Sequence, residues 1–187
     1  DDGTSTMDYE PEEINRKISI SSAFDHCEWD GHSIHFVDTP GYGDFIGDTR
    51  ACMRALDCAV VILSAISGVK VQTEEVWEWA NEFEIPRIAF VNKMDKERAN
   101  FLRAIDDIEK IVKARGVAIQ MPIGAEEDFE GVIDLVTMKA CRYKQDGGGG
   151  CEEMTIPDEL LAEAQRLREH MFEVVAEAYD ALTEKYL

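Results

Sequence analysis

The chain has 187 residues, of which 45% are hydrophobic, so it can bury a sizeable core in one domain with a small additional subdomain. Its 39 acidic and 19 basic side chains give a net charge of −20. This charge argues against DNA binding or other nucleic-acid binding over the whole surface, because phosphates would be repelled. No apolar run approaches the roughly 20 residues that cross a membrane. The five cysteines lack Cys-x-x-Cys spacing, so we expect neither zinc nor a disulfide framework, and a cytoplasmic location.

The first part of the chain predicts a loop followed by a β-hairpin. Residues 1–17 are polar and show no sustained hydrophobic period, so we expect a loop there. Alternation of apolar and polar residues then predicts a strand that begins at Ile18 and continues to Trp29. Asp30-Gly31 separates this run from a second apolar run that ends at Asp38, and Asp-Gly is a strong hairpin signal. The two strands are therefore expected to be antiparallel, with the first at the sheet edge.

The middle of the chain alternates between helix and strand patterns. Apolar residues at helical spacing predict helices over residues 46–56, 72–83 and 100–114. Apolar runs predict strands over residues 59–63, 87–91 and 119–123, and the continuous run of the first indicates burial on both faces. Alternating strands and helices indicate an α/β fold in which helices flank a mostly parallel sheet.

Beyond Gly124 the pattern changes to that of a small α+β subdomain. Residues 131–135 and 140–143 predict two antiparallel strands, and residues 147–150 predict a flexible glycine-rich connection. Helix-start residues near Asp158 introduce a long amphipathic helix, or two helices, that reach residue 187. Its predicted inward face consists of Leu160, Ala164, Leu167, Met171, Val174, Ala178 and Leu182.

Two apolar strands end directly in polar residues, the second of them at Asn92-Lys93-Met94-Asp95. In an open α/β sheet, ligands bind at the carboxyl ends of the strands. The Asp95 carboxylate can accept hydrogen bonds from N1 and N2 of guanine, whereas adenine would leave it unpaired. Asn92 would tie the loop to the base edge, and the stem of Lys93 would lie along the ring. The alternative is a turn that is polar only because it meets water.

The first of these strand ends, Asp38-Thr39-Pro40-Gly41, has the residue types of a phosphate-sensing loop. Asp38 would hold Mg²⁺ through water, because Mg²⁺ keeps several waters and needs few carboxylates. Gly41 would let its peptide turn towards a γ-phosphate and donate its N–H, which a side chain would obstruct. An ordinary tight turn is the alternative for this motif alone. The two motifs together predict a GTP site.

Several segments resemble one known family. Asp38-Thr39-Pro40-Gly41 and residues 86–95 resemble the GTPase domain of translation elongation factor G. Further matches are Ser5-Thr6-Met7-Asp8-Tyr9, Ile18-Ser19-Ile20, Ala99-Asn100-Phe101-Leu102, Ile123-Gly124-Ala125-Glu126-Glu127, Gly131-Val132-Ile133-Asp134-Leu135 and Glu184-Lys185-Tyr186-Leu187. The resemblance implies a partial GTP-binding domain of P-loop-NTPase type over residues 1–124. It also implies part of an inserted subdomain over residues 125–187.

The resemblance further implies a Mg²⁺ site and a catalytic position. Ser19 keeps a hydroxyl where the family usually has threonine as a Mg²⁺ ligand, and Asp38 would be its partner. Tyr42 stands where the family has a histidine that orients the attacking water. A phenol can position water but is a poor base at neutral pH, so we expect hydrolysis to be weakened rather than abolished. The alternative is that Tyr42 is a surface aromatic without a role. With this substitution, the chain resembles a divergent, paralogous branch of the family.

Parts of a complete GTP site are not found in the sequence. It contains no Gly-x-x-x-x-Gly-Lys-[Ser/Thr] motif, whose loop holds the α- and β-phosphates. The resemblance places that loop and its central strand before Asp1, and a second guanine-contacting loop after Leu187. The sequence also opens without methionine. We therefore expect the chain to be part of a longer protein and to bind GTP poorly or not at all alone.

The resemblance implies the ribosome as partner. Arg16, Lys17, Arg50 and Arg54 gather near the switch residues and would face large-subunit RNA, although isolated basic residues are often merely solvated. The acidic closing helix resembles the surface that meets the ribosomal stalk, and a solvated helix face is its plainer interpretation.

Together these features predict a translational GTPase that acts in elongation (translocation), a monomer in its intact form. A ribosomal protection protein and a release-factor-like GTPase are alternative enzymes. A non-hydrolysing GTP-binding or ribosome-binding module is an alternative from another class.

Overall fold

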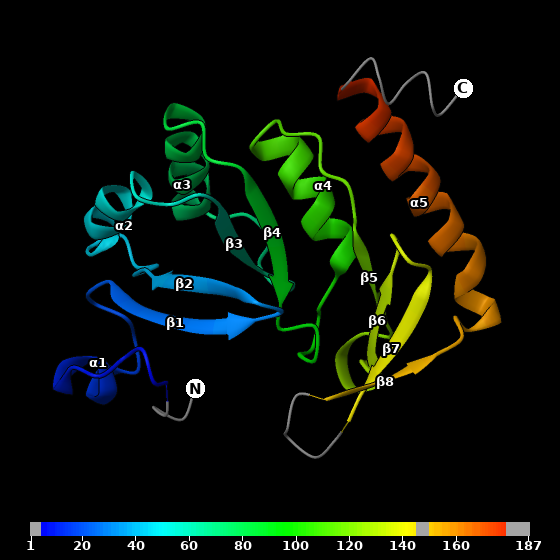
Figure 1. Cartoon of the computed structure of the whole chain (residues 1–187), viewed down its shortest axis with the longest axis horizontal. Coiled ribbons are helices and arrows are strands. Elements are labelled where there is room, and N and C mark those ends of the chain that lie inside the picture. The colour runs from blue at the N-terminus through cyan, green and yellow to red at the C-terminus, as the bar shows by residue number, and fades with distance from the viewer. Residues whose placement is uncertain (1–4, 145–149, 179–187) are drawn as a thin grey trace. The chain divides into compact units, whose positions relative to one another are not determined.

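The computed structural model describes residues 5–144 and 150–178 (Figure 1). The chain divides into two compact units, and each is described by itself. The first unit contains residues 1–61 and 70–89, and the second contains residues 62–69 and 90–187. The predicted domains over residues 1–124 and 125–187 stay a prediction.

The first unit contains the predicted hairpin. Strand β1 (Ala23–Trp29) pairs antiparallel with β2 (His32–Asp38), in a register that places Ala23 opposite Asp38. Asp30 and Gly31 form the turn, with φ values of 49° and 75°. Both residues lie in the left-handed region that a tight two-residue hairpin turn requires, so the Asp-Gly prediction is confirmed.

The segment before the hairpin contains a short helix where a loop was predicted. Helix α1 (Pro11–Arg16) contains Glu13, whose side chain is only 2% exposed. Its Oε1 accepts hydrogen bonds from the backbone N–H groups of Ile20 at 2.8 Å and Ser21 at 3.0 Å. These groups therefore do not pair with a strand, and β1 begins only at Ala23. The prediction of a strand from Ile18 was wrong for this reason.

Two helices pack together in the first unit. Helix α2 (Ile46–Met53) ends three residues before the predicted end, and α3 (Val71–Glu82) lies close to its prediction (Figure 1). Their shared core consists of Met53, Ala80 and Ile85, against which partly buried hydrophobic residues pack: Leu56, Ala59, Val76, Trp79 and Phe83. This packing anchors the end of α2, the helix that follows the predicted phosphate-sensing loop.

Strands β3 (Ala59–Ser64) and β4 (Arg87–Asn92) form a two-stranded sheet. Backbone bonds Ala59 N to Pro86 O and Ala65 N to Asn92 O have the same sequence offset (86 − 59 = 92 − 65), as parallel strands require.

The expected burial of β3 on both faces is wrong. Leu63 is 1% exposed, whereas Val60 is 60% and Ile62 57% exposed. Side chains of a strand alternate between faces, and within the described residues β3 pairs only with β4 and is covered on one face.

The second unit contains an antiparallel sheet with the order β5-β6-β7-β8. Its elements are α4 (Phe101–Ile111), β5 (Gln120–Ile123), the 3-10 helix η1 (Glu126–Asp128), β6 (Gly131–Asp134), β7 (Lys139–Tyr143), β8 (Cys151–Met154) and α5 (Asp158–Ala178). The expected membership of residues 119–123 in the parallel sheet is wrong, because β5 pairs antiparallel with β6. A short apolar run predicts a strand but does not identify the strand with which it pairs.

Helix α5 packs on this sheet through a continuous apolar core (Figure 1). Ala164 and Leu167 of the helix meet Ile133 and Leu135, which are both fully buried. The predicted inward positions at residues 164, 167 and 171 are buried, which confirms the helical face over this part of α5. The predicted position Leu182 and residues 147–149 of the predicted glycine-rich connection lie outside the described residues.

The cysteine prediction needs a correction. Cys141 of β7 and Cys151 of β8 form a disulfide, with their Cα atoms 5.7 Å apart. Neighbouring antiparallel strands bring the two residues within bonding range, which their separation of 10 in sequence does not reveal. Cys27, Cys52 and Cys58 are free. Within the described residues, no helix is long and apolar enough to span a membrane.

Candidate nucleotide-binding site

The predicted Mg²⁺ ligands lie in the first unit, beside a residue that sequence reasoning missed. The Ser19 hydroxyl donates a 2.8 Å hydrogen bond to Oδ1 of Asp8. Desolvation, and then the negative charge of Asp8, raise the pKa of Asp38 above its usual range. Asp8 thus interacts with both predicted ligands: it accepts a hydrogen bond from Ser19, and its negative charge acts on Asp38. Its only sequence signal was its place within a segment that resembles the family.

The local charge favours a cation. A raised carboxyl pKa means that the ionised form of Asp38 is disfavoured in the folded chain. The ionisation of Asp38 therefore costs stability as the pH rises above the ordinary pKa of an aspartate carboxyl group. A bound cation would remove this cost. The Ser19 hydroxyl donates its proton to Asp8, and the lone pairs of its oxygen stay available to a metal ion. Carboxylate and hydroxyl oxygens are the donors that Mg²⁺ prefers, so this donor set fits the ion.

The turn after Asp38 is anchored from α2. Pro40 is fully buried, and its carbonyl accepts a 3.0 Å hydrogen bond from the Thr49 hydroxyl. Thr49 is itself only 5% exposed. Pro40 therefore joins the turn after β2 to α2 through a buried polar contact. Sequence reasoning gave Thr49 no role and missed this bond.

Replacing Thr49 by valine is expected to lower the free energy of unfolding by about 2 kcal/mol, because the buried Pro40 carbonyl loses its donor. Thr49→Ser keeps the hydroxyl and serves as the matched control, with a smaller loss from the missing methyl group. Urea unfolding followed by circular dichroism measures both variants. Equal stability of the valine variant and the wild type would show that the bond contributes nothing.

Gly41 and Tyr42 directly follow Pro40 in this turn and are exposed to solvent. A Cβ atom built on Gly41 meets nothing within 4 Å, so the predicted obstruction by a side chain stays a prediction about the nucleotide-bound loop. The Tyr42 side chain is 58% exposed, and its carbonyl accepts a 2.9 Å bond from the N–H of Phe45. The backbone of Tyr42 is therefore fixed while its phenol reaches solvent.

The predicted guanine-reading loop lies in the second unit, at the end of β4. The side-chain oxygen of Asn92 accepts a 2.7 Å bond from the N–H of Lys93, whose φ of 65° turns the chain sharply. Met94 is buried, and its carbonyl accepts a 2.8 Å bond from the N–H of Glu126. Glu126 also accepts a 2.6 Å bond from the N–H of Arg98. Glu126 thus braces the loop, a role that the sequence did not signal.

Asp95 projects from this braced loop into solvent. Its carboxylate lies 2.8 Å from the Lys96 ammonium, and this hydrogen bond lowers the pKa of Asp95. The carboxylate is therefore ionised at neutral pH, which is the state that accepts bonds from a guanine base. The ion pair is exposed and costs little to rearrange.

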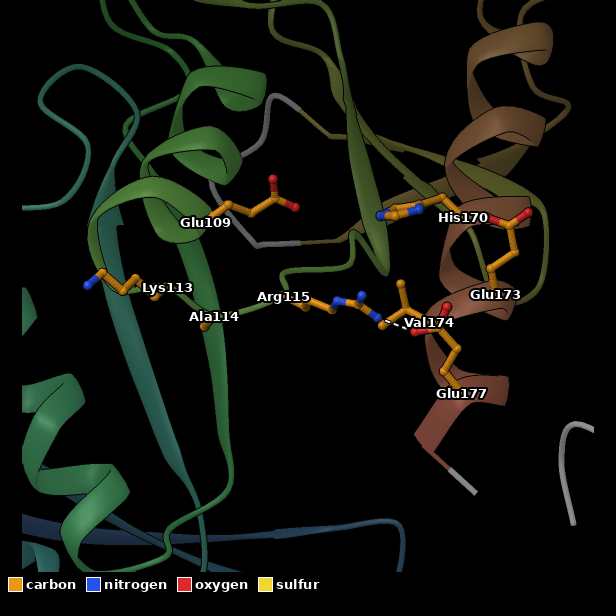
Figure 2. A pocket seen from close by; sticks show the side chains of 8 residues that line it. All are labelled: Glu109, Lys113, Ala114, Arg115, His170, Glu173, Val174 and Glu177. Atoms are coloured by element: carbon orange, nitrogen blue, oxygen red, sulfur yellow. Dashed lines mark hydrogen bonds and ion pairs between the residues drawn. The ribbon is translucent and has the colours of Figure 1, made fainter. Parts of the chain in front are cut away.

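Two cavities in the described part of the second unit do not contain the complete predicted set. One cavity of about 380 Å³ lies between the end of α4 and α5, with Arg115 paired to Glu177 across it (Figure 2). It includes none of the predicted site residues. A second cavity of about 320 Å³ has an apolar lining that includes Met94 but not Asn92 or Asp95.

Two of the predicted RNA-facing basic residues, Arg50 and Arg54, make local contacts. Arg50 pairs with Glu82 at 2.9 Å and lies over the rings of Trp79 and Phe83. Arg54 lies 5.3 Å from the Phe83 ring centroid. These cation–π contacts hold the two guanidinium groups on one face of the α2–α3 pair.

Strand-end polar residues on an α/β scaffold define a candidate nucleotide-binding domain, and the comparisons identify its class. The family model described as Elongation factor Tu GTP binding domain matches residues 1–182. The chain therefore belongs to this family, and the resemblance found in the sequence is confirmed.

Two curated relatives are similar over the whole chain. Elongation factor G of Thermotoga neapolitana is 46% identical over 187 residues, and that of Thermotoga maritima is 44% identical. The alignment spans 100% of this chain but 27% of each relative.

A crystal structure from Thermus thermophilus matches 98% of this chain and 27% of its own, with a TM-score of 0.88 and 32% identity. This match confirms the α/β fold class. The chain thus spans about a quarter of the length of these similar proteins.

Proposed function

We propose that the chain is part of a ribosome-associated translational GTPase of the elongation factor G type, which acts in translocation. The observation that carries this proposal is the pair of motifs that begin at Asp38 and Asn92, each of which is the last residue of a strand. The 44–46% identity to elongation factor G proteins supports it over the entire chain.

In this proposal, each motif has a separate task. Asp95 reads the guanine edge, and Gly41 donates its N–H to the γ-phosphate. Asp38 and Ser19 would hold Mg²⁺, which supplies positive charge to the phosphates. Tyr42 positions the attacking water, because a partly exposed phenol on a fixed backbone can direct a hydrogen bond without acting as a strong base.

The ribosome is the proposed partner, and the cytoplasm is the proposed location. Arg50 and Arg54 would face large-subunit RNA from the α2–α3 face, where their guanidinium groups lie over Phe83. The acidic face of α5 would meet the stalk proteins. The intact protein is proposed to act as a monomer, like a factor that docks transiently.

One observation favours a second function. Tyr42 occupies the position of the family's histidine, so a non-hydrolysing GTP-binding or ribosome-binding module is the alternative. Turnover of GTP by the natural protein that carries this chain separates the two functions, because only the first requires it.

Replacing Tyr42 by phenylalanine is expected to lower kcat for GTP hydrolysis about tenfold and to leave GTP affinity unchanged, because the phenol oxygen would act on the water alone. Single-turnover hydrolysis of GTP by the natural protein measures this change, and the affinity of a fluorescent GTP analogue is the control. An unchanged kcat would identify Tyr42 as a surface aromatic. A complete absence of turnover in the wild type would favour the binding module.

A further inference from the structure

Two histidines of the hairpin have no role in the proposed GTP site. His26 of β1 and His35 of β2 stand directly opposite each other in the antiparallel register. Their rings are stacked, with centroids 5.8 Å apart and an angle of 22° between the ring planes. Both side chains are exposed to solvent. The pair therefore presents two imidazole groups side by side on one face of the hairpin.

The ring nitrogens of this pair are available as ligands. Among the described residues, the rings of His26 and His35 have no hydrogen-bond or ion-pair partner. His32, by contrast, places Nδ1 2.9 Å from the carbonyl oxygen of Asp30. Neutral imidazole is a preferred ligand of Zn²⁺, Ni²⁺ and Cu²⁺. Two rings bound to one tetrahedral ion at about 2.0–2.1 Å have centroids about 5 Å apart, close to the 5.8 Å between the centroids of His26 and His35. Because stacked rings present their faces to each other, both side chains must rotate to direct a nitrogen at a shared ion.

The surrounding charge favours a cation. Glu28 follows His26 by two residues and so projects from the same face of β1, opposite Ser33. The whole chain carries a net charge of −20. No group of three or more His, Cys, Asp or Glu side chains among the described residues is arranged to hold a metal. A site here would therefore have two protein ligands, with water completing the coordination.

We propose that His26 and His35 bind a divalent transition-metal ion of the Zn²⁺, Ni²⁺ and Cu²⁺ class across the β1–β2 hairpin. This site is separate from the proposed Mg²⁺ position, because Mg²⁺ prefers oxygen ligands. The bound ion links the two strands at mid-hairpin. It thereby stabilises the strand that leads directly to Asp38.

Zn²⁺ titration of the full chain, followed by NMR of the histidine rings, tests this site. The signals of His26 and His35 are expected to shift together and to saturate with one Zn²⁺. Those of His32 and His170 are expected to stay in place, and they complete the four histidines of the chain. Because the readout is specific to each ring, Zn²⁺ bound to a free thiol does not imitate it. A millimolar excess of Mg²⁺ is expected not to displace the ion.

Single substitutions give the second arm of the test. His26→Ala and His35→Ala are each expected to weaken Zn²⁺ affinity at least about tenfold, because each removes one of two protein ligands. His32→Ala is the matched control on the same hairpin and is expected to change nothing. All three residues are exposed, and backbone amide spectra verify the fold of each variant. Absence of any shift at His26 and His35, or full affinity in both variants, would overturn the proposal.

Discussion

Replacing Asp95 by asparagine is expected to lower the affinity of the natural protein for GTP about 100-fold and to raise its affinity for xanthosine triphosphate. The Asp95 carboxylate accepts from two donors of guanine, whereas an amide presents one acceptor and one donor. Xanthine has an oxygen in place of the exocyclic amine, and so it pairs with that donor. Competition against a fluorescent GTP analogue measures both affinities.

The matched control for this substitution is Asp106→Asn. Asp106 pairs with Lys110 at 3.1 Å on the exposed face of α4, just as Asp95 pairs with Lys96, but it belongs to no predicted site. Exposed ion pairs contribute about 0–1 kcal/mol, so the control is expected to leave both nucleotide affinities unchanged. Equal behaviour of the two variants would remove Asp95 from the base-reading role.

Replacing Glu13 by glutamine is expected to destabilise the segment around α1 by about 3 kcal/mol. The buried carboxylate accepts three backbone N–H bonds, from Glu10, Ile20 and Ser21, and an uncharged amide accepts fewer and weaker ones. Because 1.4 kcal/mol corresponds to a factor of ten, amide exchange at Ile20 and Ser21 is expected to accelerate about 100-fold. Hydrogen exchange followed by NMR measures it.

The neighbouring Glu12→Gln variant is the control, since Glu12 is exposed and, among the described residues, forms an ion pair only with Arg16. The pH supplies a second reading. The backbone hydrogen bonds, first that of Ser21, lower the pKa of Glu13, so its contribution is present above the ordinary carboxyl pKa and is lost as the pH falls through the lowered value. The protection of the Ile20 amide against hydrogen exchange is expected to fall on acidification in the wild type and to change less in Glu13→Gln. Slow exchange in Glu13→Gln at neutral pH would contradict the assigned role.

Local signals predicted the elements that local chemistry determines. Asp30-Gly31 specified the hairpin because few residue pairs adopt two positive φ values without strain. The apolar runs before Asp38 and Asn92 located the strands that carry both motifs. These signals depend on neighbours in sequence, which is why they could be read without the structure.

Features that depend on distant contacts could not be predicted in this way. A charged residue such as Glu13 is normally exposed, and only its three backbone donors make its burial favourable. The partner of β5 is determined by the core under α5 rather than by the run itself. The same limit applies to the candidate site, where Asp8, Thr49 and Glu126 act through partners remote in sequence.

GTP turnover by the natural protein, measured with and without ribosomes, tests the central claim most directly. The claim predicts slow turnover alone and a steep rise when ribosomes are added, because docking would order the loop around Gly41 and Tyr42. Asp38→Asn is expected to abolish the rise, since it removes the proposed Mg²⁺ carboxylate. Turnover that is absent under both conditions, or that ribosomes leave unchanged, would contradict a ribosome-associated GTPase.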